Sequence, residues 1–149
     1  MENRYKERLV TRQSIYIDSK RLLEWLYVVR WKVNRRDRAY LFDTLLIPYV
    51  LSMIAHFCRA FQFREERIRE IDLFLFDFDR VEGLIDMASS RKILSAKQYS
   101  LTIGWTERIR ESIKAWRASA RKSIQPVRSS NEGAHAETED NPRGGDGLI

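Results

Sequence analysis

The chain contains a single cysteine and few residues that break helices. Cys58 has no partner for an intrachain disulfide, so a reducing, cytoplasmic compartment is expected. Only six glycines and three prolines occur among the 149 residues, and two of the prolines follow residue 124. A sheet of many strands needs frequent turn residues, so this scarcity favours long helices. The sequence predicts an all-α fold.

The chain also lacks a long uninterrupted hydrophobic run. Its most apolar stretch extends from Leu45 to Cys58 and is interrupted by Pro48 and by polar residues. That is shorter than the roughly 20 apolar residues that span a bilayer. The opening residues, MENRYKERLVTRQ, have no apolar core of the kind a signal peptide needs. We therefore expect a buried core helix here and no membrane partner.

Basic residues outnumber acidic ones in most of the chain but not at its end. The net charge is +6, yet 25 of the 27 basic and 16 of the 21 acidic residues precede Gln125, which gives that part +9. A compact domain with such an excess has a positive field, and polyanions are its natural partners. Residues 125–149 are rich in Pro, Gly, Ser and acidic residues, so they predict a disordered acidic tail.

Apolar residues recur at helical spacing in four segments. The segments are residues 16–33, 38–61, 65–89 and 95–123. In the first, Leu22, Leu26, Val29 and Val33 share one face. In the second, the predicted stripe comprises Leu41, Leu45, Tyr49, Ser52 and His56, extended by Leu46, Met53, Phe57 and Ala60. The pattern predicts an antiparallel up-down-up-down four-helix bundle over residues 15–124, after an N-terminal extension of residues 1–14.

Turn and cap residues mark the ends of these helices. Asp18 or Ser14 can cap the first helix, and Asp37 can cap the second after Asn34 ends the first. Pro48 lies within the second segment, which predicts a kink near residues 44–48. Ser95 followed by Gln98 three residues later is the pattern of a capping box, so the fourth helix should begin there.

The excess of cations is concentrated in two places. Arg35, Arg36 and Arg38 form a cationic corner between the first two helices. On the fourth helix, spacings of 4, 3 and 4 predict one basic stripe, formed by Arg110, Lys114, Arg117 and Arg121. These seven residues are the predicted contacts to nucleic-acid phosphates.

The sequence contains only weak patterns for metal binding or catalysis. The Glu-x-x-His pair of a di-iron bundle is missing, because Met53 stands three residues before His56. His56 is read as a core or interface histidine, and Cys58 as an inert thiol. The third helix carries carboxylates that could be imagined as a general acid and base, but mixed charges on a helix usually form ion pairs. They are Asp72, Asp77, Asp79 and Glu82. No metal, cofactor or catalytic activity is predicted.

Several segments resemble one small family of helical bundles. Residues 19–27, SKRLLEWLY, resemble an L-x-x-L-Y first helix, and residues 93–99, ILSAKQY, resemble the L-[ST]-x-x-Q-[YV] start of a fourth. Residues 69–81 resemble the third helix, and Trp116 stands where the family has a near-terminal tryptophan. The family includes the accessory variability determinant (Avd) proteins of diversity-generating retroelements. It also includes proteins encoded within intervening sequences of bacterial 23S ribosomal RNA genes.

The resemblance covers residues 15–122 and implies a function. Members of this family form barrel-like homopentamers, and in the retroelement they bind the reverse transcriptase and the template-repeat RNA to support mutagenic cDNA synthesis. The family's Gly-Arg-x-x-Gly-x-Trp run differs here, since Arg110 and Lys114 replace the glycines and Glu111 the arginine. An oligomer would also accommodate aromatic residues outside the main apolar stripes. The predicted interface residues are Trp25, Trp31, Phe74, Phe76, Trp105 and Trp116.

Two other hypotheses remain beside this one. The first is an orphan oligomeric bundle of the ribosomal intervening-sequence type, with a structural role. The second is an enzyme that uses the carboxylates of the third helix, for which Asp72 and Asp79 would be the residues to change. A widened core within one chain is the simpler explanation for the extra aromatic residues.

Overall fold

The computed structural model describes the backbone of residues 13–147 and the side chains of residues 13–124. This part of the chain is all-α, as predicted, and contains no strand. Four long helices are joined by short connections, some of which are helical turns. In chain order the elements are α2 (Ser14–Val29), η1 (Arg30–Lys32), α3 (Arg35–Asp37), η2 (Arg38–Leu46), α4 (Ile47–Gln62), η3 (Arg64–Glu66), α5 (Arg67–Ser90) and α6 (Ala96–Gly147).

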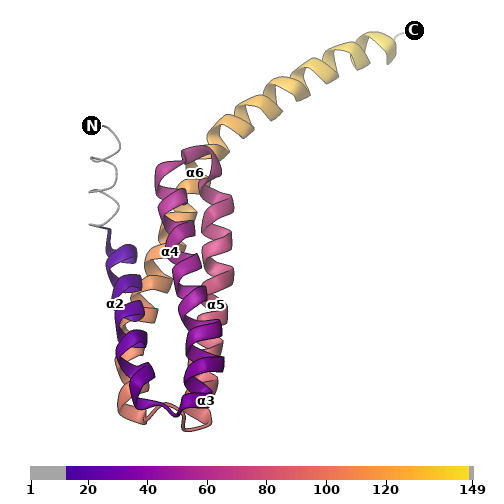
Figure 1. Ribbon diagram of the computed structural model, residues 1–149. Coiled ribbons are helices and arrows are strands. Elements are labelled where there is room, and N and C mark those ends of the chain that lie inside the picture. The colour runs from indigo at the N-terminus through magenta and orange to yellow at the C-terminus, as the bar shows by residue number, and fades with distance from the viewer. Residues whose placement is uncertain (1–12, 148–149) are drawn as a thin grey trace. The chain divides into compact units, whose positions relative to one another are not determined.

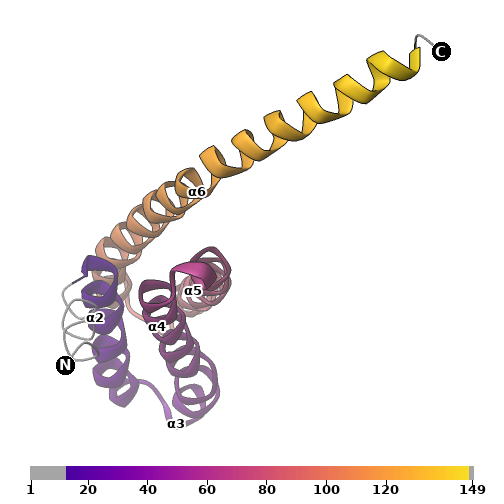
Figure 2. The same ribbon diagram turned by 90° about the horizontal axis from the view of Figure 1, so that it is seen from above.

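The chain divides into two compact units, and the boundary falls within α6. The first unit ends at Ala115, and the second is Trp116–Ile149. In the first unit α2 packs on α4, and α4 packs along α5. Figures 1 and 2 show the first part of α6 beside α2. An edge-on contact between Trp25 and Trp105, with ring centroids 6.5 Å apart, joins these two helices.

The core of the first unit is built from one face of each long helix. Leu22 and Leu26 of α2 are fully buried, as the sequence pattern predicts, and Ile109 and Ile113 of α6 are fully buried too. On α5 the rings of Phe74 and Phe78 stack with centroids 6.1 Å apart. Each large buried side chain contributes about 1.5–3 kcal/mol, so these faces dominate the stability of the unit.

The second predicted helix contains a π-helix, which changes its buried face. Residues Arg38–Leu46 form η2, with backbone hydrogen bonds that skip one residue more than in an α-helix. Pro48 then lies in the first turn of α4, where its missing N–H is tolerated. The predicted kink at residues 44–48 is thus a change of helix type. The buried residues are Leu41, Phe42, Leu46, Ile47, Val50, Met53, Phe57 and Ala60.

The π-helix explains why the predicted stripe on this segment is wrong in part. The buried pair Leu41 and Phe42 is followed by the buried pair Leu46 and Ile47, five residues later, and the series then continues at steps of three and four. The prediction assumed a constant α-helical period and chose Leu45, Tyr49 and His56, which are only half-buried. A wider turn rotates every later side chain around the helix axis, so the inward face shifts.

The N-terminal cap of α6 agrees with the prediction, whereas that of α2 differs from it. At α6, Ser95 Oγ accepts from the N–H of Gln98 at 3.1 Å, and Gln98 Oε1 accepts from the N–H of Ser95 at 2.9 Å, so the capping box is confirmed. The predicted caps of α2 are wrong. The N-cap is Gln13, which makes no side-chain capping bond, and Asp18 is buried within the helix.

The ends of the chain are described only in part. Of the predicted N-terminal extension, residues 1–12 lie outside the described residues. After residue 124 the sequence predicts a disordered tail, whereas the structure continues the backbone of α6 to Gly147. Side chains from residue 125 onward lie outside the described residues, so a role for the acidic tail stays a prediction.

One described helical segment is long and apolar enough to cross a membrane by length and composition alone. It comprises residues Arg35–Gln62, that is α3, η2 and α4 together. Core helices of globular proteins pass the same test. Here the fully buried Val50, Met53 and Ala60 of α4 form the face that packs against the other helices.

Candidate nucleic-acid interface

The first connection, between α2 and η2, is a short corner held by its own side chains. Asn34 caps α3, because its Oδ1 accepts from the N–H of Asp37 at 2.9 Å and its Nδ2 donates to Asp37 Oδ2 at 2.7 Å. The sequence assigned the cap to Asp37, which instead lies in the first turn. Arg35 and Arg36 follow the cap directly and are exposed. The corner therefore holds these two cations in solvent on a fixed backbone.

Arg38, the third predicted cation of this corner, has a structural role. Its Nε donates to the carbonyl oxygen of Arg30 at 2.7 Å, and its Nη2 donates to that of Val33 at 3.0 Å. Both carbonyls lie near the ends of α2 and η1, and that of Arg30 also accepts from the N–H of Val33 at 3.4 Å. The guanidinium of Arg38 thus closes the corner, and only part of it is available to a ligand.

A second arginine stiffens the same corner. Arg30 donates from Nε and Nη2 to the two carboxylate oxygens of Asp43, both at 2.7 Å. This fork of hydrogen bonds raises the pKa of Arg30 and holds the pKa of Asp43 below its ordinary value. The guanidinium carbons of Arg30 and Arg38 lie 4.6 and 4.7 Å from the ring centre of Trp31. The indole of Trp31 nevertheless remains 65% exposed.

The second connection, between α5 and α6, brings two more cations that the sequence analysis did not assign to a site. The N–H of Ile93 bonds to the carbonyl of Ala88 at 2.9 Å, and that of Lys92 to the carbonyl of Ser89 at 3.0 Å. This is a Schellman motif, whose next-to-last residue adopts the left-handed conformation that favours glycine. That residue is Lys92, with φ 60°. Lys92 and its neighbour Arg91 are both exposed.

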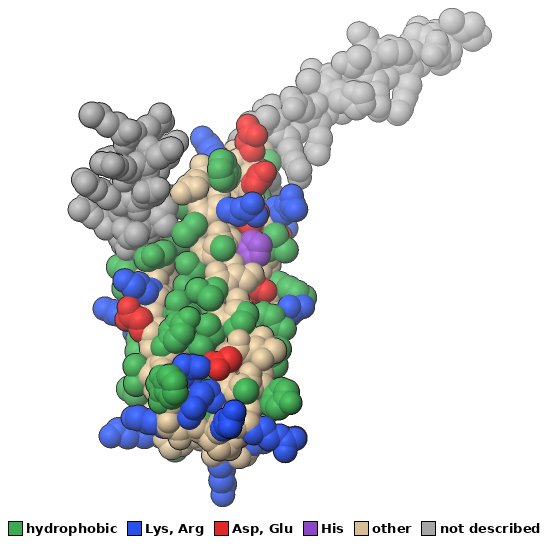
Figure 3. Space-filling view, viewed as in Figure 1, with side chains coloured by type: hydrophobic (Ala, Val, Ile, Leu, Met, Phe, Trp, Pro, Cys, Tyr) green, Lys and Arg blue, Asp and Glu red, His purple; other side chains and the backbone are tan. Residues whose placement is uncertain are grey.

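The two connections lie at the same end of the helices (Figure 1). Within residues 30–38 and 89–95 there are seven basic residues and one acidic residue, Asp37. Figure 3 shows Lys and Arg side chains gathered over this lower end. We call its exposed cations the basic pole: Lys32, Arg35, Arg36, Arg91 and Lys92. Their positive potentials add together, because none of these five side chains forms an ion pair with a carboxylate of the residues that the structure describes.

The residues of the predicted basic stripe on α6 differ in how available their charges are to a ligand. Arg110 Nη2 donates to Asp79 Oδ1 at 2.8 Å and also contacts Glu82, both on α5. Burial acts to lower the pKa of Arg110, but its hydrogen bonds with these carboxylates outweigh that effect and raise it. Its charge is therefore compensated within the chain. Lys114 is exposed.

The other two members of the stripe lie in the second unit. Arg117 is half-buried and Arg121 is exposed on the continuation of α6. A single nucleic-acid site that uses all four stripe residues therefore stays a prediction.

The predicted interface residues divide into two groups. Phe74 is fully buried and Trp25 is 8% exposed, so both belong to the chain's own core, and their prediction as subunit contacts is wrong. The helical spacing could not separate an inward face from an outward one here. Trp31 and Phe76 are 65% and 55% exposed, respectively. Trp105 and Trp116 are half-buried.

The carboxylates suggested for catalysis on α5 are distributed over separate ion pairs. Asp79 and Glu82 pair with Arg110. Asp77 is buried and accepts from Ser52 Oγ at 2.6 Å, with His56 Nε2 3.7 Å away. Asp72 is exposed on the same helix. Asp79 and Asp77 thus belong to two separate clusters, one with Arg110 and the other with Ser52 and His56.

His56 lies between two buried carboxylates. The sequence predicts a core or interface histidine but does not predict these two partners. Nδ1 of His56 is 2.5 Å from Glu70 Oε2, and Glu70 is 3% exposed. Glu70 Oε1 also lies 3.9 Å from Nη1 of Arg59. Buried charges persist in proteins when they are paired, and this cluster pairs them across α4 and α5.

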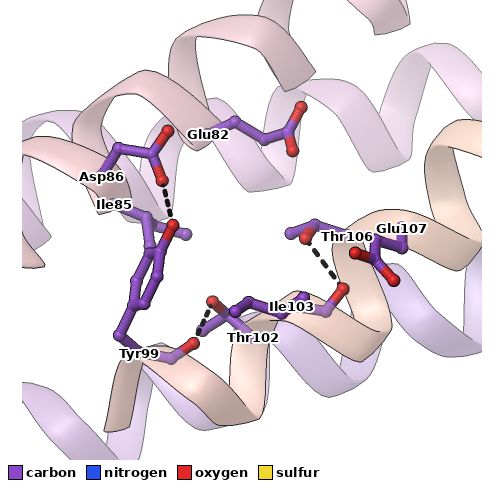
Figure 4. Close-up of a pocket in the computed structure, with 8 residues that line it drawn as sticks. All are labelled: Glu82, Ile85, Asp86, Tyr99, Thr102, Ile103, Thr106 and Glu107. Atoms are coloured by element: carbon purple, nitrogen blue, oxygen red, sulfur yellow. Dashed lines mark hydrogen bonds between the residues drawn. The ribbon is translucent and has the colours of Figure 1, made fainter. Parts of the chain in front are cut away.

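A groove between α5 and α6 is lined by acidic residues (Figure 4). Glu82, Asp86 and Glu107 face it, and Tyr99 donates a hydrogen bond to Asp86 Oδ1 at 2.6 Å. That bond raises the pKa of the Tyr99 phenol. Glu82 is already paired with Arg110, whereas Asp86 and Glu107 give the groove a negative potential that disfavours phosphate.

Among the described residues no group of three His, Cys, Asp or Glu side chains is placed to hold a metal ion.

Comparisons with family models, with curated proteins and with solved structures found no match to this chain.

Proposed function

We propose that this protein is a non-catalytic, nucleic-acid-binding accessory subunit of a reverse-transcriptase ribonucleoprotein of the diversity-generating retroelement type. The observation that carries the nucleic-acid part is the basic pole, where two connections far apart in sequence hold five exposed cations at one end of the helices. The retroelement part is supported by the sequence resemblance to the Avd family. The partners are the reverse transcriptase and the template-repeat RNA or its cDNA, in the cytoplasm.

The binding would be electrostatic and largely tolerant of sequence. Lys and Arg side chains neutralise phosphates and release counterions, so affinity falls as salt rises. Side chains that contact only phosphates position the protein without reading bases. The subunit would hold the template RNA near the transcriptase, which performs the polymerase chemistry, and it would need no metal, cofactor or membrane of its own.

We further propose that the helices form an antiparallel up-down-up-down bundle that assembles as a barrel-like homopentamer. Exposed apolar side chains on several helices support self-association, since large exposed apolar surface commonly marks an interface. They include Val28 of α2, Leu51 of α4, Phe76 of α5 and Leu101 of α6, each exposed by 47% to 60%.

The alternative is an orphan oligomeric bundle of the 23S ribosomal intervening-sequence type, with a structural role. The pairing of Arg110 with Asp79 and Glu82 favours it, because this pairing removes a cation from the predicted stripe. A neighbouring reverse transcriptase gene with a template and variable repeat pair would favour the retroelement function. A position within a ribosomal RNA gene would favour the structural one.

Charge reversal at the pole tests the nucleic-acid part. R35E/R36E should weaken binding of a fluorescently labelled RNA at moderate salt by about tenfold or more, since each phosphate contact contributes severalfold. The matched control is R64E/R69E, which reverses two exposed arginines beyond the other end of α4. It makes the same change in net charge about 40 Å away, given the length of a 28-residue helix. Equal losses in both variants would show that only the overall charge matters.

The basic stripe and the transcriptase each need a separate test. Reversal of Arg110, Lys114, Arg117 and Arg121 together should leave most of the RNA affinity intact if the pole is the main site. If that reversal abolishes binding while R35E/R36E does not, the stripe is the site. For the polymerase, the mass of the purified protein is measured alone and after co-expression with a neighbouring transcriptase. A stable complex supports the accessory role, and its absence contradicts it.

A further inference from the structure

We propose that Trp31 is a base-stacking residue, and that the basic pole therefore selects single-stranded over double-stranded nucleic acid. This inference rests on the proposed nucleic-acid binding and names the class of ligand that the pole takes. It depends on the exposure of the indole, on the contacts that hold it, and on the charges around it.

The indole of Trp31 points away from the core that its neighbours in sequence enter. Its neighbours Val29 and Val33 are 3% and 7% exposed, whereas Trp31 is 65% exposed. The guanidinium carbons of Arg30 and Arg38 lie within 5 Å of the ring centre. If these two groups covered both faces of the ring, little of the side chain would remain exposed. The large exposed fraction instead implies that the two guanidinium groups leave part of the ring open to a ligand.

The ring is also held in place before any ligand arrives. Arg30 is fixed by its two hydrogen bonds to Asp43, and Arg38 by its bonds to backbone carbonyl oxygens. Both guanidinium groups lie against Trp31 through cation–π contacts. An aromatic ring that is fixed in advance loses little conformational entropy on binding, which strengthens the interaction with a ligand.

The charges around Trp31 identify the ligand as a polyanion. Lys32 follows it directly, and Arg35 and Arg36 lie within the same corner, all exposed. The core of a protein–protein interface is depleted of charged residues, and two copies of this corner would repel each other. An exposed ring beside cations that track a phosphate backbone is the arrangement used to bind single strands.

Strand selectivity follows from base geometry. In a duplex the bases are stacked on one another, so an isolated aromatic side chain has no base face to contact. In a single strand an unpaired base can stack on the ring, and this stacking is largely independent of sequence. The pole should hence bind duplexes through phosphates alone and single strands through phosphates and Trp31 together.

The experiment compares W31A, W31F and the wild type on a labelled single strand and on a duplex of the same length at matched salt. W31A should weaken single-strand binding by about fivefold or more and leave duplex binding within about twofold. W31F keeps a ring and should restore most of the affinity. The control is F63A, which removes another exposed aromatic beside an arginine, Arg64, at the other end of α4.

The outcomes separate this inference from the proposed function. If the wild type binds neither strand even at low salt, the proposed nucleic-acid function fails. If it binds both, but W31A weakens neither or weakens both equally, the pole binds phosphates and the stacking role of Trp31 is overturned. Circular dichroism and urea unfolding of W31A confirm that the fold is retained.

Discussion

The ring nitrogen Nδ1 of His56 lies 2.5 Å from Oε2 of Glu70, and this contact joins α4 to α5. Glu70 is almost completely buried, and the other ring nitrogen of His56 faces the buried Asp77. Two carboxylates inside a helical interface are costly unless donors face them. His56 therefore stabilises this interface by facing both buried carboxylates.

Removal of His56 should destabilise the protein more than removal of a nearby hydroxyl. H56A leaves Glu70 buried without its closest partner, and we expect it to lower the free energy of unfolding by about 2 kcal/mol or more. S52A removes only the donor to Asp77 and should cost about 1 kcal/mol. Urea denaturation measures both. If H56A costs no more than S52A, the histidine is not what compensates the buried carboxylates.

Lys92 offers a case in which stability and binding should change in opposite directions. K92G relieves a left-handed conformation that a lysine adopts with strain, so the free energy of unfolding should rise by about 1 kcal/mol. It also removes a cation from the basic pole and should weaken RNA binding severalfold.

K92A is the matched control for K92G. It removes the same cation without relieving the strained backbone, so it should lose affinity without gaining stability. If K92G and K92A bind RNA as tightly as the wild type, Lys92 does not belong to the nucleic-acid interface.

The single cysteine provides a measurement that depends on pH. Partial burial on α4 raises the pKa of the Cys58 thiol above its ordinary value. The folded chain should thus react with a thiol reagent near pH 8 more slowly than the chain unfolded in urea. Because the thiolate is favoured in the unfolded chain, stability is full below the ordinary thiol pKa and falls as pH rises through the higher folded value. Equal reaction rates in both states would show that Cys58 is not protected, with C58A as the blank.

Self-association should depend on exposed apolar residues and not on the buried aromatic residues. F76E places a charge on a side chain that is 55% exposed, so it should lower the molar mass measured by light scattering while leaving the helical content unchanged. A matched substitution, D72K, changes the charge at another exposed position of α5 by one unit more and should preserve the mass. An unchanged mass in F76E would place the subunit interface elsewhere.

The sequence predicts the helices well because each long helix has an apolar face with a regular period. Leu22 and Leu26 are buried as expected, and the capping box of Ser95 and Gln98 forms as expected. The period is broken between Leu41 and Leu46, where a π-helix inserts a wider turn. A periodicity that assumes one helix type cannot locate such a turn, although Pro48 indicates that the regular pattern ends nearby.

The candidate site is predicted less completely, because it depends on tertiary contacts. Arg35 and Arg36 follow from the sequence, but their convergence with Arg91 and Lys92 depends on which helix ends lie together. Likewise, only the packing of α6 on α5 pairs Arg110 with Asp79 and Glu82. A count of cations along a helix cannot tell a free charge from a compensated one.

The most direct test of the central claim is to map where RNA contacts the protein. A single-stranded RNA that contains 4-thiouridine is cross-linked to the intact protein by ultraviolet light, and the modified peptides are identified by mass spectrometry. The basic pole predicts cross-links within residues 30–38 and 89–95, including Trp31. Cross-links found only within residues 59–69 or 105–121, with none at the pole, would contradict this account.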